Sequence, residues 1–420
     1  MRSYKISGFM AGAVVLSTSL IAGCGGGTNA VDKTAGLPPA VAAAYRSAGT
    51  VPPEIVGSNN DFGFSLLRQL RTTDAGNNVF VSPTSAALCL EIVYNGAGAG
   101  SATQTEMAKT LNISGTSVAD LNNDNASLQA SLVSADPAVQ LSVANSLWYY
   151  KANSQVLPSF VDMNTQFYGS QIGDLSGAPD NINAWISNQT GGKINQAVDI
   201  SIRDCVAAIV NAVYFKGLWT APFDPKATTS DTFTLQNGTT TPCNLMHRDD
   251  SFPYFKGDNF QAVKIPYGTG RFSMAVLLPN AGQTVDTVLA ELSQTNWAAW
   301  KSQFAPKQGS IALPKFTSKY STDLKGSLSA LGMTSVFDPN KADLSLIGPA
   351  LFLSKITHDT YLSVDETGTV AAGVTVGGVG VTSVPADTFT LRMDRPFICV
   401  ISDEKSGDVL FCGAIDRPKL

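Results

Sequence analysis

The sequence has few of the residues on which hydrolytic and metal-dependent catalysis usually depends. Its 420 residues include two histidines, His247 and His358, and no Gly-x-Ser-x-Gly segment that would mark a serine nucleophile. No Cys-x-x-Cys pair occurs, which argues against a thiolate metal site. The sequence therefore gives no reason to expect a metal or another cofactor, and a serine hydrolase is the weakest functional hypothesis.

Charged residues are also scarce. They make up 15% of the chain, and the formal net charge is −5. A negative balance without a basic cluster argues against a nucleic-acid partner. The hydrophobic fraction of 44% and the length are compatible with one large domain.

Two short matches to catalytic motifs are better explained by chance. Ser402 and Lys405 form a Ser-x-x-Lys match, but the segment reads as a hairpin turn and no Lys-Thr-Gly partner exists. Gly377, Gly378 and Gly380 are not a phosphate loop, because no helix follows and no Lys-Ser or Lys-Thr pair closes the segment.

The amino terminus predicts export. Residues 1–23 have a positive start, a weakly apolar core and small residues at the end, as a signal peptide does. Leu20 to Cys24 resembles a bacterial lipobox, which implies lipidation of Cys24, anchoring to a bacterial membrane and a periplasmic or cell-surface location. An ordinary signal peptide with a chance cysteine is the alternative. Residues 24–57, rich in Gly, Ala, Pro and Thr, are predicted to be a flexible tether before a domain at 58–420.

Five cysteines remain if Cys24 is lipidated, so at least one is unpaired within a single chain. Cys399 and Cys412 lie in two predicted strands of one hairpin. If the hairpin centres on Lys405 and Ser406, the two cysteines face each other and could form a disulfide in an oxidising compartment. The sequence leaves this pairing open.

The most unusual stretch is 364–388, which carries no charge between Thr367 and Ala386. Alternate residues would share one face of a strand, and one such set contains only small side chains. Its members are Thr369, Ala371, Gly373, Thr375, Gly377 and Val379. Such a segment packs poorly as an isolated strand but could slide between two existing strands. A low-complexity linker is the alternative, because long loops in compact domains are usually functional or disordered.

Upstream, residues 206–215 form a nearly continuous apolar run, which is typical of a strand covered on both faces. Asn211 lies inside this run, so it should belong to a buried polar cluster. Ser101 and Gln104 have capping-box spacing before a short helix. Antiparallel strand patterns and scattered helices together predict the α+β class.

Several segments, in order, resemble the serpin family of protease inhibitors. They are Ser-Pro-Thr-Ser at 82–85, the Gly-rich run at 95–107, Lys-Gly-Leu-Trp at 216–219, Asp-Glu-Thr-Gly-Thr-Val-Ala-Ala-Gly at 365–373 and Arg-Pro-Phe at 395–397. The resemblance covers residues 58–420. It implies a large central mixed sheet, smaller sheets, surrounding helices and an exposed reactive loop at about 366–388.

The resemblance also implies roles for particular residues. Sixteen residues on from Glu366, the usual family interval, the reactive bond falls at Thr382–Ser383. The hinge of the loop would comprise Glu366, Gly368, Thr369, Ala371, Ala372 and Gly373. A hydrogen-bonded cluster that lets the central strands part would comprise Ser82, Ser85, Asn183, Asn211 and His358. Trp219 would lie at the top of the sheet.

Small residues before the predicted cut indicate a serine protease with a small primary pocket, elastase-like or subtilisin-like, as the partner. The chain departs from the family pattern at Val370, where a second acidic residue is usual, and at Thr367. Neither residue is bulky, so loop insertion remains open, and a serpin-fold binding protein that does not inhibit is the alternative. We expect a monomer, with some tendency of Val374–Val384 to pair with a neighbour's sheet.

Overall fold

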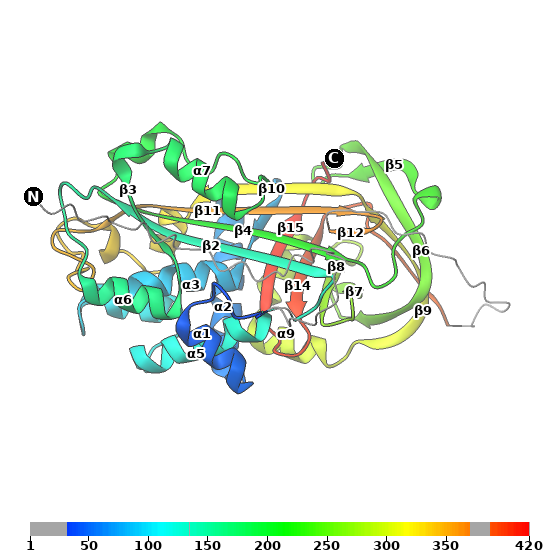
Figure 1. The fold of residues 1–420 in the computed structure, drawn as a ribbon. Helices are drawn as coiled ribbons and strands as arrows, with labels where there is room; N and C mark the ends of the chain where they lie inside the picture. Colours follow the sequence, from blue (N-terminus) through cyan, green and yellow to red (C-terminus); the bar gives the residue numbers. More distant parts are fainter. Residues whose placement is uncertain (1–31, 134, 370–386, 420) are drawn as a thin grey trace, which may run out of the picture.

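The computed structural model describes residues 32–133, 135–369 and 387–419, and it confirms the α+β class (Figure 1). Helices and strands alternate irregularly along the chain. The α-helices are α1 Pro39–Ser47, α2 Pro53–Thr73, α3 Pro83–Tyr94, α4 Ala102–Thr110, α5 Val118–Leu132, α6 Pro158–Phe167, α7 Asp180–Gln189, α8 Val285–Glu291, α9 Gln294–Lys301 and α10 Lys325–Ala330.

A six-stranded mixed sheet runs along the molecule in the order β10-β11-β12-β4-β2-β3. Its strands are β2 Val139–Tyr149, β3 Gln171–Asp174, β4 Ala207–Leu218, β10 Phe316–Asp323, β11 Leu353–Asp365 and the two-residue β12 Gly368–Thr369. The predicted two-sided strand is confirmed in β4, where every residue from Ala207 to Phe215 is buried. This strand lies at the centre of the sheet between β2 and the β11–β12 pair.

The second sheet has nine strands in the order β1-β15-β14-β8-β7-β6-β9-β13, with β5 paired to β6 outside this path. Its strands are β1 Val79–Val81, β5 Thr229–Thr234, β6 Thr240–Lys256, β7 Phe260–Tyr267, β8 Phe272–Pro279, β9 Ala305–Pro314, β13 Phe389–Arg392, β14 Phe397–Asp403 and β15 Val409–Ile415. The strand β13 follows the loop segment 370–386, so the two ends of that segment attach to different sheets.

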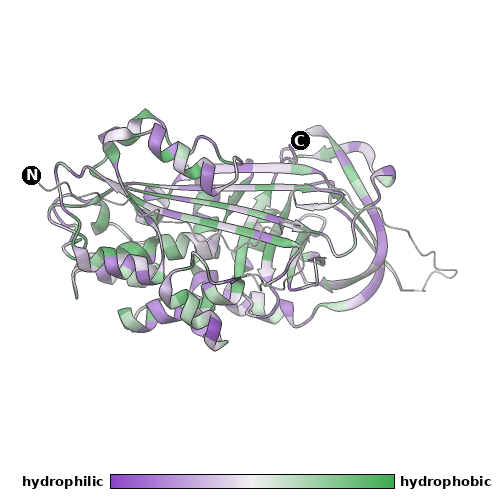
Figure 2. Cartoon of the chain, viewed as in Figure 1, coloured by the Kyte–Doolittle hydropathy of each residue, from purple (hydrophilic) through white to green (hydrophobic). Residues whose placement is uncertain are grey.

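Helices cover the six-stranded sheet on both faces (Figure 1). On one face α7 packs Ile182 and Ile186 against small residues of β4, including Ala208 and Ala212. On the other face lie α2, α3 and the nine-stranded sheet, and the apolar residues gather in the space between them (Figure 2). Within the described residues, no helix combines the length and apolarity needed to cross a bilayer.

The predicted tether is too long. Within residues 24–57, α1 forms and α2 already begins at Pro53, five residues before the predicted start of the domain. Val41 of α1 is fully buried, and α1 packs against α5 and α6. Ala42 is also buried, and Ala44 and Tyr45 pack against the core. The stability of this short helix therefore comes mainly from tertiary packing, which its composition does not reveal.

Val41→Ala should therefore lower the free energy of unfolding by about 1–3 kcal/mol, because it leaves a cavity beneath α1. Ala43→Ser is the matched control, since Ala43 lies on the exposed face of the same helix. Urea unfolding of both variants measures the difference. Equal midpoints for Val41→Ala and the wild-type protein would show that α1 does not contribute to stability.

Candidate functional site

The start of the predicted loop already lies inside the six-stranded sheet. We call the end of the sheet near Leu218 and Asp365 its top. Below that end, β4 and β11 pair directly as parallel strands, from Ala207 opposite Leu353 to Tyr214 opposite Tyr361. At the top, β12 separates β4 from β11 and pairs antiparallel with both strands. We call the boundary between β4 and β11 the seam. The seam is thus closed along most of its length and is occupied at the top by two residues of the hinge.

A tight turn directs the chain back into the seam. Asp365 lies opposite Gly368, so Glu366 and Thr367 form a two-residue turn between β11 and β12. The carboxylate of Asp365 accepts hydrogen bonds from the backbone N–H groups of Thr367, at 2.9 Å, and Gly368, at 3.3 Å. This pattern of an aspartate bonding to the backbone two residues on is typical of turns.

Gly368 is required by close backbone approach. Its φ of +153° is unfavourable for residues with a side chain. A Cβ atom would lie 2.1 Å from the carbonyl oxygen of Gly217 and 2.7 Å from Cα of Leu218. The predicted hinge glycine therefore permits β12 to approach β4 at hydrogen-bonding distance.

The next residue, Thr369, is fully buried. Its hydroxyl lies 2.9 Å from the hydroxyl of Tyr267, at the end of β7. The ring of Trp219 stacks on the Tyr267 ring, with centroids 4.4 Å apart. Trp219 also donates from its backbone N–H to the carbonyl of Thr367 and from Nε1 to the carbonyl of Asp365. The predicted tryptophan at the top of the sheet thus holds the turn from two sides.

Glu366 anchors the turn to neighbouring strands. Its carboxylate lies 2.8 Å from Nζ of Lys315 and accepts a 2.7 Å hydrogen bond from Thr228. Burial raises the pKa of Glu366, but the contacts with Lys315 and Thr228 outweigh burial and leave the pKa below its usual value. The acid is therefore held in its charged form at the point where the loop leaves the sheet.

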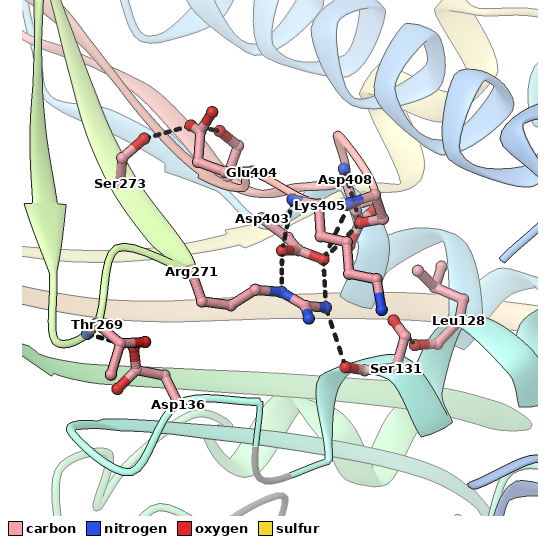
Figure 3. Close-up of polar contacts among 12 residues, drawn as sticks. Leu128, Ser131, Asp136, Thr269, Arg271, Ser273, Asp403, Glu404, Lys405 and Asp408 are labelled. Carbon is pink, nitrogen blue, oxygen red and sulfur yellow. Dashed lines mark hydrogen bonds and ion pairs between the residues drawn. The ribbon is translucent and has the colours of Figure 1, made fainter. Parts of the chain in front are cut away.

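A second set of contacts fixes the neighbouring end of β2 (Figure 3). The carboxylate of Asp136 accepts hydrogen bonds from the backbone N–H and hydroxyl of Thr269, which lies in the turn between β7 and β8. Arg271 donates to the carbonyl of Ser131 at the end of α5 and pairs with the buried Asp403. The turn that follows Tyr267 is thus tied both to the hinge and to the segment leading into β2.

The polar cluster lies lower on the seam. His358 of β11 and Asn211 of β4 are direct partners across it. Nδ1 of His358 lies 2.5 Å from Oδ1 of Asn211, and the backbone N–H of Ser82 donates to Nε2 at 3.2 Å. Nε2 is therefore the acceptor, and the neutral ring carries its proton on Nδ1. Burial lowers the pKa of His358 to about 4.

Asn211 completes the cluster. Its Nδ2 donates to the hydroxyl of Ser85 and to Oδ1 of Asn145, both at 2.5 Å. Asn145 lies on β2 opposite Asn211 and was missed by the sequence analysis. An amide within the alternating apolar pattern of residues 141–150 was the available signal. The cluster thus joins β2, β4, β11 and the start of α3, and Ser82 takes part through its backbone rather than its hydroxyl.

Asn183 does not belong to this cluster, contrary to the prediction. It lies on α7, over the opposite face of the sheet. Its side chain donates to the carbonyl of Val198 and accepts from the backbone N–H groups of Ala197 and Val198. Asn183 therefore fastens the segment that follows α7 and has no contact with the seam.

The structure also contradicts the possible disulfide between Cys399 and Cys412. Cys399 and Cys412 are both free and buried. Cys399 pairs with Gly413, and Cys412 pairs with Val400, so the register differs by one residue from the one that would join them. A one-residue shift places the two side chains on opposite faces of the sheet. An irregularity between Ile401 and Ser402 accompanies this register.

Other predicted site residues lie outside the described part of the chain. They are the signal peptide, Cys24, the hinge residues Ala371, Ala372 and Gly373, the departure at Val370 and the reactive bond Thr382–Ser383. Among the residues that the structure describes, no group of three His, Cys, Asp or Glu side chains could hold a metal ion.

The neutral His358 makes stability depend on pH. The unfolded chain has a histidine pKa of about 6.5, so it takes up a proton before the native state does. The contribution of His358 to native stability should therefore be complete above about pH 6.5 and fall as the pH drops toward about 4. His358→Gln should remove this contribution, as measured by urea midpoints across that range.

The comparison must be between variants, because buried carboxyl groups titrate in the same range with the opposite sign. Burial raises the pKa of Asp359 to about 7, for example, which favours the native state at low pH. His247→Gln, a change near the surface on β6, is the control and should keep the slope of the wild-type protein. The same slope in His358→Gln would contradict the assignment.

The site thus consists of a two-residue strand, β12, that pairs with both central strands β4 and β11, and of a buried polar cluster further along the same seam. A model of the family described as Serpin (serine protease inhibitor) matches residues 57–418. The chain therefore belongs to the serpin family, which is described as a family of serine protease inhibitors.

Curated relatives and solved structures agree with this family assignment. The chain is 31% identical over 386 residues to leukocyte elastase inhibitor from Bos taurus, covering 87% of this chain and 100% of the relative. It is 30% identical over 375 residues to serpin B9 from Homo sapiens, covering 86% and 98%. Tengpin, a thermophilic serpin solved in the native state, superposes with a TM-score of 0.82 at 26% identity, covering 88% and 95%. Human thyroxine-binding globulin in complex with thyroxine gives a TM-score of 0.79 at 25% identity, covering 87% and 99%.

Proposed function

We propose that this serpin inhibits serine proteases as a suicide substrate. The protease cleaves the loop and becomes an acyl-enzyme on the new carboxyl terminus. The freed loop then inserts between β4 and β11 and carries the protease away from its cleavage position. The observation that supports this mechanism is the position of β12, whose two residues already pair with both strands at the top of the seam.

The register of β12 defines where the rest of the loop would go. Thr369 pairs with Val364 on one side and Gly217 on the other. Continuing these two pairings downward, Thr375 would reach the level of His358 and Asn211, which are partners of each other in the uncleaved protein. Residues 370–380 would span the seam as far as its lower end, so insertion would break the contact between His358 and Asn211.

The same register explains why alternate loop residues are small. Val364, Leu362 and His358 share the buried face of β11 that looks toward the nine-stranded sheet. Their partners in the inserted strand would be Thr369, Ala371 and Thr375, all members of the small set. This face is covered by packed side chains, so a large residue on the loop would clash with them.

The free energy of insertion is adequate for the task. Each new ladder hydrogen bond contributes about 0.5–1.5 kcal/mol net, and residues 370–380 would gain bonds on both sides while the direct β4–β11 bonds are lost. The balance is on the order of 10 kcal/mol, comparable to the whole stability of a typical domain, about 5–15 kcal/mol. The uncleaved protein must therefore be kinetically trapped.

The proposed cleavage site is Thr382–Ser383, and the proposed targets are elastase-like or subtilisin-like proteases. Several relatives, among them the one from Bos taurus, are named as leukocyte elastase inhibitors, which supports a small primary pocket. The test is to incubate the purified protein with an elastase-type and a trypsin-type protease and to separate the products on a denaturing gel. A covalent complex with the elastase-type enzyme supports the proposal. Cleavage without a complex would indicate a serpin-fold binding protein instead.

We also propose that Cys24 carries the lipid that holds the protein at a bacterial membrane, facing the periplasm or the exterior. The lipobox-like sequence before Cys24 supports this. Metabolic labelling with a fatty acid should mark the wild-type chain, and Cys24→Ala should be unlabelled and released from the membrane fraction. Labelling of Cys24→Ala at the wild-type level would refute the anchor without affecting the inhibitory mechanism.

A further inference from the structure

The strand β10 forms one edge of the six-stranded sheet, and its outward backbone groups can be assigned. The backbone N–H of Leu324 donates to the carbonyl of Ile356, so even-numbered residues of this segment bond to β11. In an antiparallel pair the intervening residues direct their N–H and C=O groups away from the partner strand. The outward residues of β10 are therefore Thr317, Lys319, Ser321 and Asp323, of which Asp323 lies outside the groove described next.

As far as residue 419, the described part of the carboxyl-terminal tail uses the first of these outward groups. The backbone N–H of Thr317 donates to the carbonyl of Lys419 at 2.6 Å, and the carboxyl terminus lies beside this end of β10 (Figure 1). Beyond it, Lys319 and Ser321 are exposed. Together with the tail and the segment Asp74–Asn78, they line a groove of about 290 Å³. The groove therefore runs beside an open strand edge.

The groove is positively charged. Among the described residues that line it, Lys319, Arg417 and Lys419 are cationic and Asp74 alone is acidic. The carboxylate of Asp74 already accepts a 2.7 Å hydrogen bond from the hydroxyl of Tyr320. A further lining residue, Ser318, is only 2% exposed, and its hydroxyl has no hydrogen-bond partner. Buried polar groups without partners are rare, and a bound water molecule is one common partner for such a group.

We propose that this groove binds an extended acidic peptide segment of a partner protein, which adds to β10 as a further strand. The outward N–H and C=O groups of Lys319 and Ser321 would supply the ladder bonds. Lysine on an edge strand normally prevents pairing with other chains. Here Lys319, Arg417 and Lys419 select the partner, because acidic side chains on the added strand neutralise them and uncharged strands do not.

Fluorescence anisotropy of the purified protein with a labelled short peptide of alternating Glu and Val tests the proposal. The peptide of alternating Lys and Val is the charge control. Ser321→Pro removes one outward N–H without affecting the bonds between β10 and β11, and Ser321→Ala is its matched control. Lys319→Glu combined with Lys419→Glu reverses the charge of the groove.

We expect Ser321→Pro to weaken binding of the acidic peptide about threefold to tenfold, as for the loss of one net hydrogen bond, and Ser321→Ala to leave it unchanged. The charge reversal should weaken binding by about tenfold or more at low salt, and less at high salt. Equal binding of the Lys-Val peptide would overturn the proposal. The proposal would also be overturned if inorganic phosphate displaced the acidic peptide and Ser321→Pro bound the peptide as tightly as the wild-type protein. That result would indicate a site for small anions.

Discussion

Cleavage of the loop near Thr382–Ser383 should raise the midpoint of thermal unfolding by at least about 15 °C. The physical reason is the balance of about 10 kcal/mol from the inserted strand, since each kcal/mol shifts the midpoint by a few degrees in mid-sized domains and somewhat less in larger ones. Differential scanning calorimetry of the intact protein and of protein nicked with a catalytic amount of elastase-type protease measures the change.

The nicked protein must be intact elsewhere, which a denaturing gel with one large and one small fragment establishes. A chain nicked in a different exposed turn, for example near Gly238, serves as the control and should melt at or below the wild-type midpoint. Loop cleavage without a rise would mean that residues 370–380 do not enter the seam. The inhibitory mechanism would then be refuted, while membership of the family would stand.

Thr369→Arg should abolish inhibition while leaving the loop a good substrate. Thr369 is fully buried between β4 and β11 and contacts Tyr267. An arginine there would bury an unpaired charge, which costs several kcal/mol. The hinge would leave the seam and insertion would be slowed, so the acyl-enzyme would be hydrolysed first. The yield of covalent complex with an elastase-type protease should fall at least about tenfold.

Thr388→Arg is the matched control, because it introduces the same side chain at an exposed position at the opposite end of the loop, next to β13. It should form the covalent complex as efficiently as the wild-type protein. The stoichiometry of inhibition is the number of moles of serpin needed to inhibit one mole of protease completely. It should rise for Thr369→Arg and remain near the wild-type value for Thr388→Arg. Equal stoichiometries would show that the hinge does not need to enter the sheet.

The sequence predicted the parts of the site that depend on local pattern. Gly368, Glu366 and Trp219 lie at the hinge, and Asn211 proved to be in a buried polar cluster with His358. Gly368 and Asn211 are recognisable because each carries a specific constraint, namely a backbone turn that favours glycine or an amide inside an apolar run. Glu366, Trp219 and His358 were assigned through the resemblance to the serpin family. Their partners in space come from distant strands: Asn145 had a local signal in the apolar pattern around it, whereas Tyr267 had none.

The wrong predictions depended on features that a sequence does not contain. The pairing of Cys399 and Cys412 required the hairpin register, which a shift of one residue reverses. Asn183 was assigned by family pattern, although its position on α7 places it across the sheet from His358. The helix α1 forms where composition indicates a linker, because burial of Val41 against α5 and α6 outweighs weak local propensity.

The short strand β12 also bears on timing. In the proposed mechanism, two outcomes compete once the protease is bound to the cut loop as an ester. Either loop insertion carries the enzyme along the sheet, or water hydrolyses the ester and releases the enzyme. Because Gly368 and Thr369 are already seated, the first residues need not find their register, and each further residue displaces one neighbouring pair in turn. In the proposed mechanism, insertion thus begins with its first two residues already in register, and we expect the fraction of enzyme captured to depend on how firmly Gly368 and Thr369 stay in place.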